Sequence, residues 1–356
     1  MKTKQILIAF AISLVLPSLW EGPGMGLLAQ DIHFSQFYMA PVVQNPAMAG
    51  ANYDLQAVIN YKDQWQSVAS PYKTIDASYD MRFGKKEPKS GYFAGGFLFY
   101  HDMAGDAKMG TMQVGLPIAY HVLLGENSKI SAGVQPSFFQ RSMNTDALQW
   151  GNQYLAGSYS AANPTGEPVN GSASFSFFDV GSGLMWSYHK GEMYISAHNH
   201  LNVNVGFSVH HIAQPKYSYY STGNELLYRK YVLYGNANIG IKNSSLSLVP
   251  GFIMYRQGTT QEILFGTQFR YLLKENSRYT SFVNGAAVSF GAYYRAADAV
   301  VATMLIEMSH YAIGFSYDVN TSDLKSASNY KGGFEISLRF INPNPFLEGS
   351  NVSRIQ

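Results

Sequence analysis

The feature that most constrains the fold is a two-residue alternation of apolar side chains with small or polar ones, which recurs along most of the chain. In the segment 112–122 the even-numbered residues are Met, Val, Leu, Ile, Tyr and Val, and the residues between them are Gln, Gly, Pro, Ala and His. The segments 201–211, 311–319 and 334–340 repeat the pattern. Because side chains on a β-strand point alternately to opposite faces, the alternation predicts strands with one apolar and one small or polar face.

Strands of this kind build either a soluble sandwich or a membrane barrel, and three features favour the barrel. Many segments run for about 9–11 residues or more, which is the length that a tilted strand needs to cross a bilayer. Aromatic residues recur near segment ends, as at Tyr92, Tyr120 and Tyr188, where membrane barrels carry aromatic girdles. The second face is mostly Gly, Ser, Asn and Gln, and only 13% of all residues are charged, against about 25% in an average soluble domain. Such a face suits a barrel lumen better than the water-facing side of a sandwich.

The N-terminus predicts a secretory signal peptide over residues 1–30. Lys2 and Lys4 precede the apolar run 6–16, which is too short to span a bilayer as a helix, and Ala29 is a small residue at a plausible cleavage point. The alternative, a retained N-terminal anchor, is disfavoured by the flanking residues. After residue 30 no run of about 18 apolar residues occurs, so no transmembrane helix is expected. The export signal and the strands together indicate an integral outer-membrane protein of a Gram-negative bacterium.

Fourteen segments have the length and alternation of strands, and an even number is typical of bacterial barrels. They are 54–65, 72–83, 91–101, 109–124, 128–141, 173–188, 192–211, 228–241, 245–256, 260–273, 280–294, 298–308, 310–320 and 332–341. The stretch 296–308 also fits an amphipathic helix, but its strand-like flanks favour a strand. The interruption 144–171 is the longest and is expected to be an extracellular loop, and 214–227 is a second long link.

The predicted fold class is therefore all-β, a transmembrane antiparallel barrel of about 14 strands over residues 53–341. An N-terminal segment, 31–52, precedes the barrel, and a tail, 342–356, follows it. The net charge of +2, without a dense basic run, disfavours nucleic acid as a partner. The chain has no Cys, which excludes disulfides, thiolate zinc sites and a cysteine nucleophile.

Two groups of side chains resemble metal ligands by residue type. They are the histidines His198, His200, His210 and His211, and the oxygen ligands Asp102, Asp106, Asp318, Asn320 and Asp323. The histidines lack a nearby carboxylate to complete a ligand set, so a polar lumen explains them better than zinc binding. The acidic groups offer too few oxygens for calcium and fit turn chemistry better. No serine stands in a nucleophile-elbow pattern, so we expect no catalytic, metal or cofactor site and no enzyme activity.

The segment between the signal peptide and the first strand carries a recognisable series of motifs. It contains Phe34-Ser35-Gln36, Asn45-Pro46-Ala47 and Gly50, and related blocks follow at 64–65, 71–72, 102–106, 316–324 and 332–338. Each block is weak alone, but together they bracket the whole mature chain in order. In this series the chain resembles the PorP/SprF family of the type IX secretion system.

The resemblance implies an outer-membrane barrel similar to the fourteen-stranded fatty-acid channels. Such a barrel serves type IX protein secretion and, in gliding bacteria, the surface display of adhesins. The implied partners are a secreted cargo protein with a C-terminal sorting domain, periplasmic components of the secretion machine and outer-membrane lipid. The implied function is to bind the sorting domain and to help export the cargo or anchor it at the cell surface. The alternative is an outer-membrane channel or transporter for hydrophobic or small solutes.

Two groups of residues are candidate sites. Pro46 biases Asn45 to an extended conformation and Gly50 permits a tight turn, so the motif residues before the first strand fit either a plug inside the barrel or an ordinary strand-entry turn. Tyr217, Tyr219 and Tyr220 in the link 213–227 are candidate partner-binding residues, because tyrosines are favoured anchors at interfaces.

Overall fold

The structure is a computed structural model that describes most of the chain beyond the predicted signal peptide. The described residues are 31–65, 70–84, 90–155, 157–166, 172–190, 200–219, 225–274, 285–323 and 325–342. The predicted signal peptide, 1–30, and residues 343–356 of the predicted tail lie outside them.

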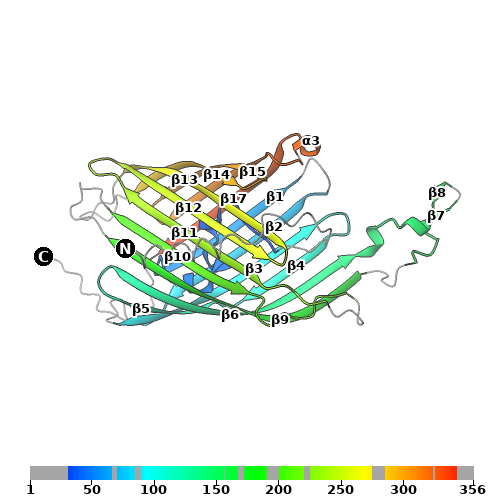
Figure 1. Cartoon of the computed structure of the whole chain (residues 1–356), viewed down its shortest axis with the longest axis horizontal. Coiled ribbons are helices and arrows are strands. Elements are labelled where there is room, and N and C mark those ends of the chain that lie inside the picture. The colour runs from blue at the N-terminus through cyan, green and yellow to red at the C-terminus, as the bar shows by residue number, and fades with distance from the viewer. Residues whose placement is uncertain are drawn as a thin grey trace, which may run out of the picture. The chain divides into compact units, whose positions relative to one another are not determined.

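Fifteen of the described strands form one antiparallel sheet (Figure 1). They are β1 (Leu55–Gln64), β2 (Tyr72–Arg82), β3 (Gly91–Ala104), β4 (Met109–Gly115), β5 (Ile118–Leu123), β6 (Ser128–Asn144), β9 (Ser172–Lys190), β10 (Leu201–His210), β11 (Lys230–Gly240), β12 (Leu246–Gln257), β13 (Thr260–Lys274), β14 (Ala286–Arg295), β15 (Ala299–Met308), β16 (Tyr311–Asn320) and β17 (Lys331–Asn342). Two further short strands, β7 (Tyr154–Leu155) and β8 (Ser158–Tyr159), pair only with each other.

The sheet closes into a barrel because its first and last strands pair. β1 and β17 are antiparallel, with the register Leu55↔Asn342 to Gln64↔Gly333. β4 and β5 occupy one position, since both lie between β3 and β6. The fifteen strands of the described sheet therefore make a closed barrel of 14 positions. This confirms the predicted fold class.

The predicted strands correspond to the observed ones with one difference. The stretch 109–124 was expected as one strand, but it is divided in two, since β4 ends at Gly115 and β5 begins at Ile118. Pro117 lies in this gap, and proline has no N–H to donate to a strand ladder. The ambiguous stretch 296–308 contains the strand β15, in agreement with its alternation. Residues 192–199 and 280–284, at the starts of the predicted strands 192–211 and 280–294, lie outside the described residues.

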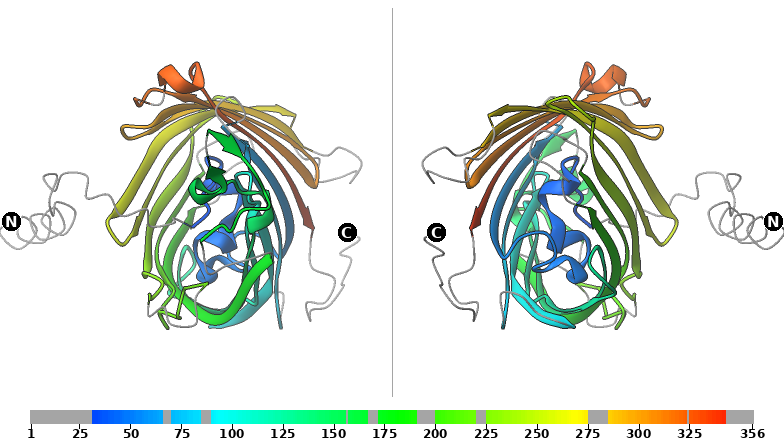
Figure 2. Two further views of the ribbon diagram at one scale, coloured as in Figure 1. Left: turned by 90° about the vertical axis from the view of Figure 1, so that its right-hand side faces the viewer. Right: turned by 90° about the vertical axis from the view of Figure 1, so that its left-hand side faces the viewer.

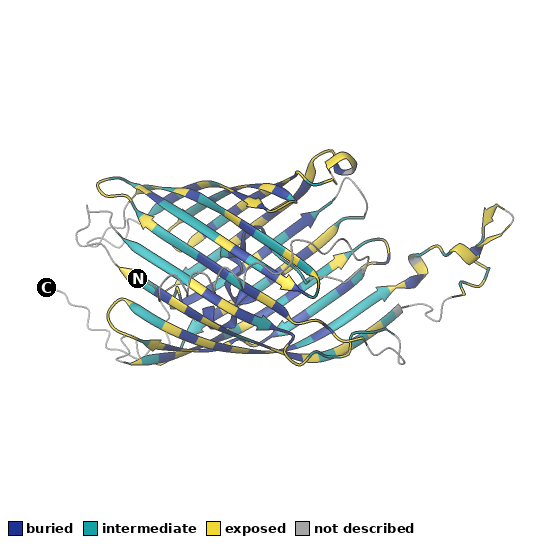
Figure 3. Cartoon of the chain, in the orientation of Figure 1, coloured by how far each residue is buried: buried dark blue, intermediate teal, exposed yellow. Residues whose placement is uncertain are grey.

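Burial along the strands is the reverse of that in a soluble protein (Figure 3). Large apolar side chains such as Phe93 and Leu184 are each 58% exposed, whereas Gln113 and His121 are buried. The apolar face of the alternation points outward and the small or polar face points into the barrel. An apolar exterior around a polar interior is what a surface in contact with lipid requires.

The links between strands differ at the two ends of the barrel. One end carries the links 145–171, 211–229 and 321–330, and we call it the loop end. The other holds the start of β1 and the last residue of β17, and we call it the termini end. Short turns such as 309–310 join strands there. Because barrel loops are long outside the cell and short on the periplasmic side, we expect the loop end to face outward.

The other described elements are short helices. η1 (Phe37–Met39), α2 (Pro41–Gln44) and η2 (Pro46–Met48) lie inside the barrel, where Figure 2 shows them in blue. α3 (Lys325–Ser328) belongs to a link at the loop end. None of the described helices has both the length and the apolar character to cross a membrane.

Candidate functional site

The lumen of the barrel is occupied by residues 32–52, which we call the inner segment. The stretch from Phe34 to Ala51 is buried almost without interruption. Helices of three or four residues are not stable in isolation, because fixing the backbone of the first turn loses more conformational entropy than its one hydrogen bond offsets. The inner segment is therefore held in shape by its contacts with the barrel wall.

The first anchor of the inner segment is a carboxylate on β17. Glu335 accepts hydrogen bonds from the backbone N–H of Ser35 at 2.7 Å and from that of Gln36 at 2.9 Å. Lys62 lies directly opposite Glu335 on β1, with Nζ 3.3 Å from the carboxylate. Hydrogen bonds to a charged acceptor are stronger than neutral ones, and the lysine offsets the cost of burying the charge.

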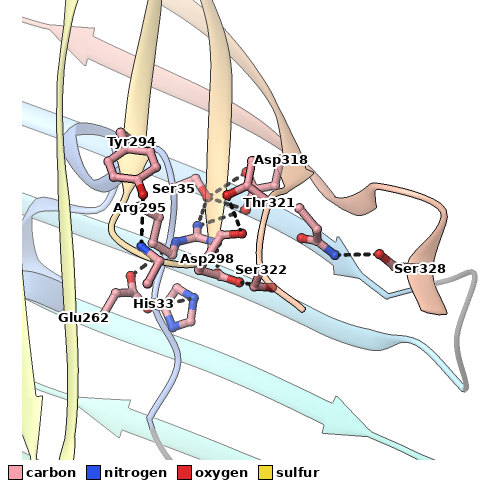
Figure 4. Close-up of polar contacts among 12 residues, drawn as sticks. His33, Ser35, Glu262, Tyr294, Arg295, Asp298, Asp318, Thr321, Ser322 and Ser328 are labelled. Carbon is pink, nitrogen blue, oxygen red and sulfur yellow. Dashed lines mark hydrogen bonds and ion pairs between the residues drawn. The ribbon is translucent and has the colours of Figure 1, made fainter. Parts of the chain in front are cut away.

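The second anchor is an ion-pair cluster around Arg295, shown in Figure 4. Its guanidinium lies 2.9 Å from Asp318, 3.1 Å from Asp298 and 3.5 Å from Glu262. The hydroxyl of Ser35 donates to Asp318 at 2.9 Å and accepts a hydrogen bond from Arg295. Ser35 thus bridges both partners of a buried ion pair. Asp318 was expected to serve turn chemistry, but it lies within β16 and faces the lumen.

His33 lies beside this cluster and contributes through its backbone and its ring. Its carbonyl oxygen accepts a hydrogen bond from Lys62 Nζ at 2.8 Å, and its Nε2 is 3.4 Å from Glu262. Burial lowers the pKa of the imidazole well below its usual range, and the positive charges of Lys62, Arg295 and Lys230 act in the same direction. The ring is therefore neutral at physiological pH.

The motif Asn45-Pro46-Ala47 is fixed on the opposite wall. Asn45 is extended, with φ −157° and ψ 121°, as expected before a proline. Its side-chain amide donates to the backbone oxygens of Leu184 on β9 and Phe207 on β10, at 3.0 and 3.3 Å. Its Oδ1 accepts the N–H of Ala47 at 2.8 Å. One side chain thus caps η2 and connects it to two strands of the wall.

Two glycines of the wall make room for this motif. Gly133 on β6 and Gly183 on β9 are cross-strand partners. A Cβ on Gly133 would lie 2.4 Å from the nitrogen of Ala47, and one on Gly183 would lie 2.1 Å from Asn45 Oδ1. Both distances are shorter than any van der Waals contact, so the close approach of the inner segment requires glycine at both positions.

The last motif residue, Gly50, makes the turn that leads into β1. Its φ of +62° is a conformation that favours glycine. Its N–H donates to Asp80 Oδ1 at 2.6 Å, and its oxygen accepts from the hydroxyl of Tyr92 at 3.2 Å. Nearby, His121 Nε2 lies 2.8 Å from the oxygen of Ala49. All seven motif residues are buried in the lumen, at Phe34, Ser35, Gln36, Asn45, Pro46, Ala47 and Gly50.

A cavity of about 610 Å³ remains between the inner segment and the termini-end halves of the strands. Its wall includes Tyr38 from the inner segment and several amide side chains from β10 and β11. Five charged residues also line it, and three of them neutralise one another in part. Arg270 lies 2.5 Å and Arg339 3.5 Å from the carboxylate of Glu307. The cavity shows that the inner segment leaves part of the lumen open.

Two of the candidate partner-binding tyrosines, Tyr217 and Tyr219, are described and lie at the loop end. Tyr217 packs edge-on against Phe175, with ring centroids 5.6 Å apart, and the guanidinium of Arg141 lies 5.0 Å from its ring centroid. Tyr219 packs against the same Phe175 at 4.9 Å. Tyr220 lies outside the described residues. The two described tyrosines therefore hold their link against the inner face of β9.

The histidines have hydrogen-bonding partners in the lumen. Nε2 of His210 lies 3.2 Å from the oxygen of Gln44, and His211 Nδ1 lies 2.5 Å from Asp179. His200 Nε2 is 3.0 Å from Asn238 Oδ1, and His198 lies outside the described residues. In the described part of the chain no three His, Asp or Glu side chains converge as a metal site would require.

The comparison with protein families identifies the chain. A family model described as "Type IX secretion system membrane protein PorP/SprF" matches residues 27–340. The chain belongs to the PorP/SprF family. The resemblance in the motif blocks is thereby confirmed, and this PorP/SprF protein is an integral outer-membrane protein of the type IX secretion system. The search of curated proteins found no significant match.

Several solved structures are similar to this PorP/SprF barrel. The CymD monoaromatic hydrocarbon channel is 10% identical, with 86% of this chain and 93% of that chain covered and a TM-score of 0.41. A TodX monoaromatic hydrocarbon channel mutant is also 10% identical, with 85% and 92% covered and a TM-score of 0.41. The translocator domain of the autotransporter NalP from Neisseria meningitidis is 9% identical, with 81% and 88% covered and a TM-score of 0.37.

Proposed function

We propose that this barrel binds the C-terminal sorting domain of a secreted protein and helps to export that protein or to anchor it at the cell surface. The observation that carries the proposal is the occupied lumen of a type IX secretion protein. The inner segment is held on one wall by Glu335 and on the other by Asn45. A lumen occupied in large part by the chain's own segment suits a docking platform better than a conduit.

The loop end supplies the surface for docking. It carries the longest link, 145–171, with the hairpin β7–β8, and the link 211–229 with the candidate tyrosines. Tyrosines combine an apolar ring with a polar hydroxyl and are enriched at the centres of interfaces. In a gliding bacterium the expected cargo is a surface adhesin. The termini end would face periplasmic components of the secretion machine.

The proposal is tested by purification of the tagged, full-length barrel in detergent from its own bacterium. We expect a secreted protein with a C-terminal sorting domain to purify with it. Deletion of the barrel gene then separates the two roles. An anchored cargo is released into the medium, whereas a cargo that needs the barrel for export accumulates in the periplasm. A deletion strain that displays all its secreted proteins normally would refute the proposal.

A second candidate is a channel or transporter for hydrophobic or small solutes, and the cavity of about 610 Å³ favours it. A volume of this size accommodates a small ligand. Uptake of small apolar and polar solutes into liposomes that contain the purified barrel tests this candidate. Uptake above the level of empty liposomes, together with normal secretion in the deletion strain, would favour the channel over the docking platform.

A further inference from the structure

Two strands of the barrel extend beyond their neighbours at the loop end, as Figure 1 shows for β6 and β9. β9 pairs with β6 from Ser172 to Tyr188 without a bulge. On its other side, β10 reaches only as far as Ser182. The part of β9 that precedes this point therefore has a paired edge toward β6 and a second edge that faces away from it.

The orientation of the backbone shows which groups lie on this second edge. The N–H of Ile212 donates to the oxygen of Val180 at 3.1 Å, so the polar groups of Val180 point away from β6. The N–H and C=O of one residue point to the same side of a strand, and the side alternates along the chain. The backbone groups of Ser174, Ser176 and Phe178 therefore point to the second edge. Within the described residues nothing forms a hydrogen bond to them.

This edge lacks the devices that usually protect a free strand. Natural edge strands carry charged side chains, prolines or bulges that prevent pairing with another chain. The stretch 173–178 reads Ala-Ser-Phe-Ser-Phe-Phe, with neither charge nor proline. Phe178 is 77% exposed beside it. Among the described residues of the link 211–229, Tyr217 and Tyr219 pack on the side chain of Phe175, which lies on the inner face of β9 and not on this edge.

We propose that the edge of β9 from Ala173 to Phe178 binds an extended strand of the exported protein by β-augmentation. The inference rests on the proposed function and assigns the surface that recognises the cargo. A row of N–H and C=O groups at every second residue is complementary to another extended chain. Phe178 supplies an apolar contact for a side chain of the added strand.

A second copy of this barrel fits the edge less well than a cargo strand does. In every copy β9 runs from the loop end to the termini end, and all copies in one membrane have the same orientation. Two β9 edges would therefore run in the same direction across the contact, which excludes antiparallel pairing between them. A strand of a separate protein has no such constraint.

The decisive variant is the double substitution Ser174→Pro and Ser176→Pro in the full-length barrel. Proline removes an N–H on the open edge and is tolerated at an edge position whose N–H faces away from the sheet. The probe is the purified secreted protein recovered with the wild-type barrel. We expect its binding to fall by about tenfold or more, because backbone hydrogen bonds to the added strand are lost. The matched control, Ser174→Ala with Ser176→Ala, keeps both N–H groups and should bind within about twofold of the wild type.

The barrel fold of each variant is checked by its heat-dependent shift in gel migration. Wild-type-like binding by a folded proline variant would overturn the proposal. If the proline variant does not fold, a photocrosslinking residue at Phe178 decides: a crosslink to a strand of the secreted protein supports the edge, and a crosslink to a second barrel or to none overturns it. A wild-type barrel that retains no secreted protein refutes the proposed function itself, whereas retention by both wild type and proline variant refutes only the edge.

Discussion

Glu335 accepts the backbone N–H of Ser35 at 2.7 Å, although 300 positions separate the two residues along the chain. The first residues of the inner segment are thereby fixed to the last strand of the barrel. The same carboxylate lies 3.3 Å from Lys62 on the first strand. One buried group thus joins the inner segment to both strands that close the barrel.

Loss of this carboxylate should destabilise the protein. In the variant Glu335→Ala, Lys62 remains as a buried charge without its partner, and two N–H groups lose their acceptor. Breaking a buried ion pair on one side costs about 3–5 kcal/mol. We expect a lower midpoint of urea unfolding in detergent. Glu307→Ala is the matched control, because Glu307 pairs with arginines of the cavity wall and not with the inner segment. This control should lower the stability of the barrel less than Glu335→Ala does. An equal effect of the two variants would contradict a special role for Glu335.

Deletion of residues 31–50 should open the barrel to ions. The intact chain places buried side chains of the inner segment across the lumen, from Ser35 to Gly50. We therefore expect low conductance of the full-length barrel in planar bilayers and stable open channels after the deletion. Unchanged conductance would show that the inner segment is not a plug.

A methyl group at the glycine pair should displace the inner segment. Gly183→Ala places a Cβ 2.1 Å from Asn45 Oδ1, and overpacking of this kind costs about 1–3 kcal/mol. We expect a lower midpoint temperature of unfolding and faster protease cleavage within the inner segment. Gly151→Ala is the matched control, since a Cβ at that position would meet no atom of the described residues within 4 Å, and it should leave both readouts unchanged. A stable, protease-resistant Gly183→Ala barrel would contradict the close contact.

Acidification should lower the stability of the folded protein through protonation of His33 in the inner segment. Its pKa is lowered in the folded protein, so the unfolded chain binds the proton more readily and stability falls as the pH drops below the ordinary value of 6.5. The loss is at most about 1.4 kcal/mol per pH unit, until the lowered pKa is reached. Lys62, Lys230, Arg295 and Glu262 face the ring. Comparison with His33→Gln isolates the effect: the stability gap between the two proteins should change between pH 7 and pH 5, and a constant gap would exclude His33.

The three candidate partner-binding tyrosines are tested together. Tyr217 and Tyr219 hold their link against Phe175, so replacing Tyr217, Tyr219 and Tyr220 with Ser should loosen that surface and reduce retention of the cargo. Retention is measured as the fraction of secreted protein that stays on whole cells. Tyr228→Ser is the control, because Tyr228 is 47% exposed and lies nearer the start of β11. Full retention by the triple variant would exclude these tyrosines as anchors.

Much of the fold follows from local patterns. The alternation in segments such as 311–319 specifies both which residues form strands and which side chains face lipid, because a two-residue period is a property of adjacent residues. Pro46 sets the extended conformation of Asn45 for the same local reason. The family motifs also single out the inner segment by sequence alone.

The contacts that hold this segment are of another kind. In the sequence, Glu335 and Arg295 are recognisable only as charged residues on a face of otherwise small or polar ones. The residues around them do not predict that Ser35 is their partner. Their contacts with the inner segment depend on barrel closure, which pairs the first strand, β1, with the last, β17. The glycine pair and the open edge of β9 likewise depend on which strands are neighbours and on how far each one extends. Hydrophobic alternation encodes the wall of the barrel locally, whereas its occupied lumen and its exposed edge arise only from long-range strand register.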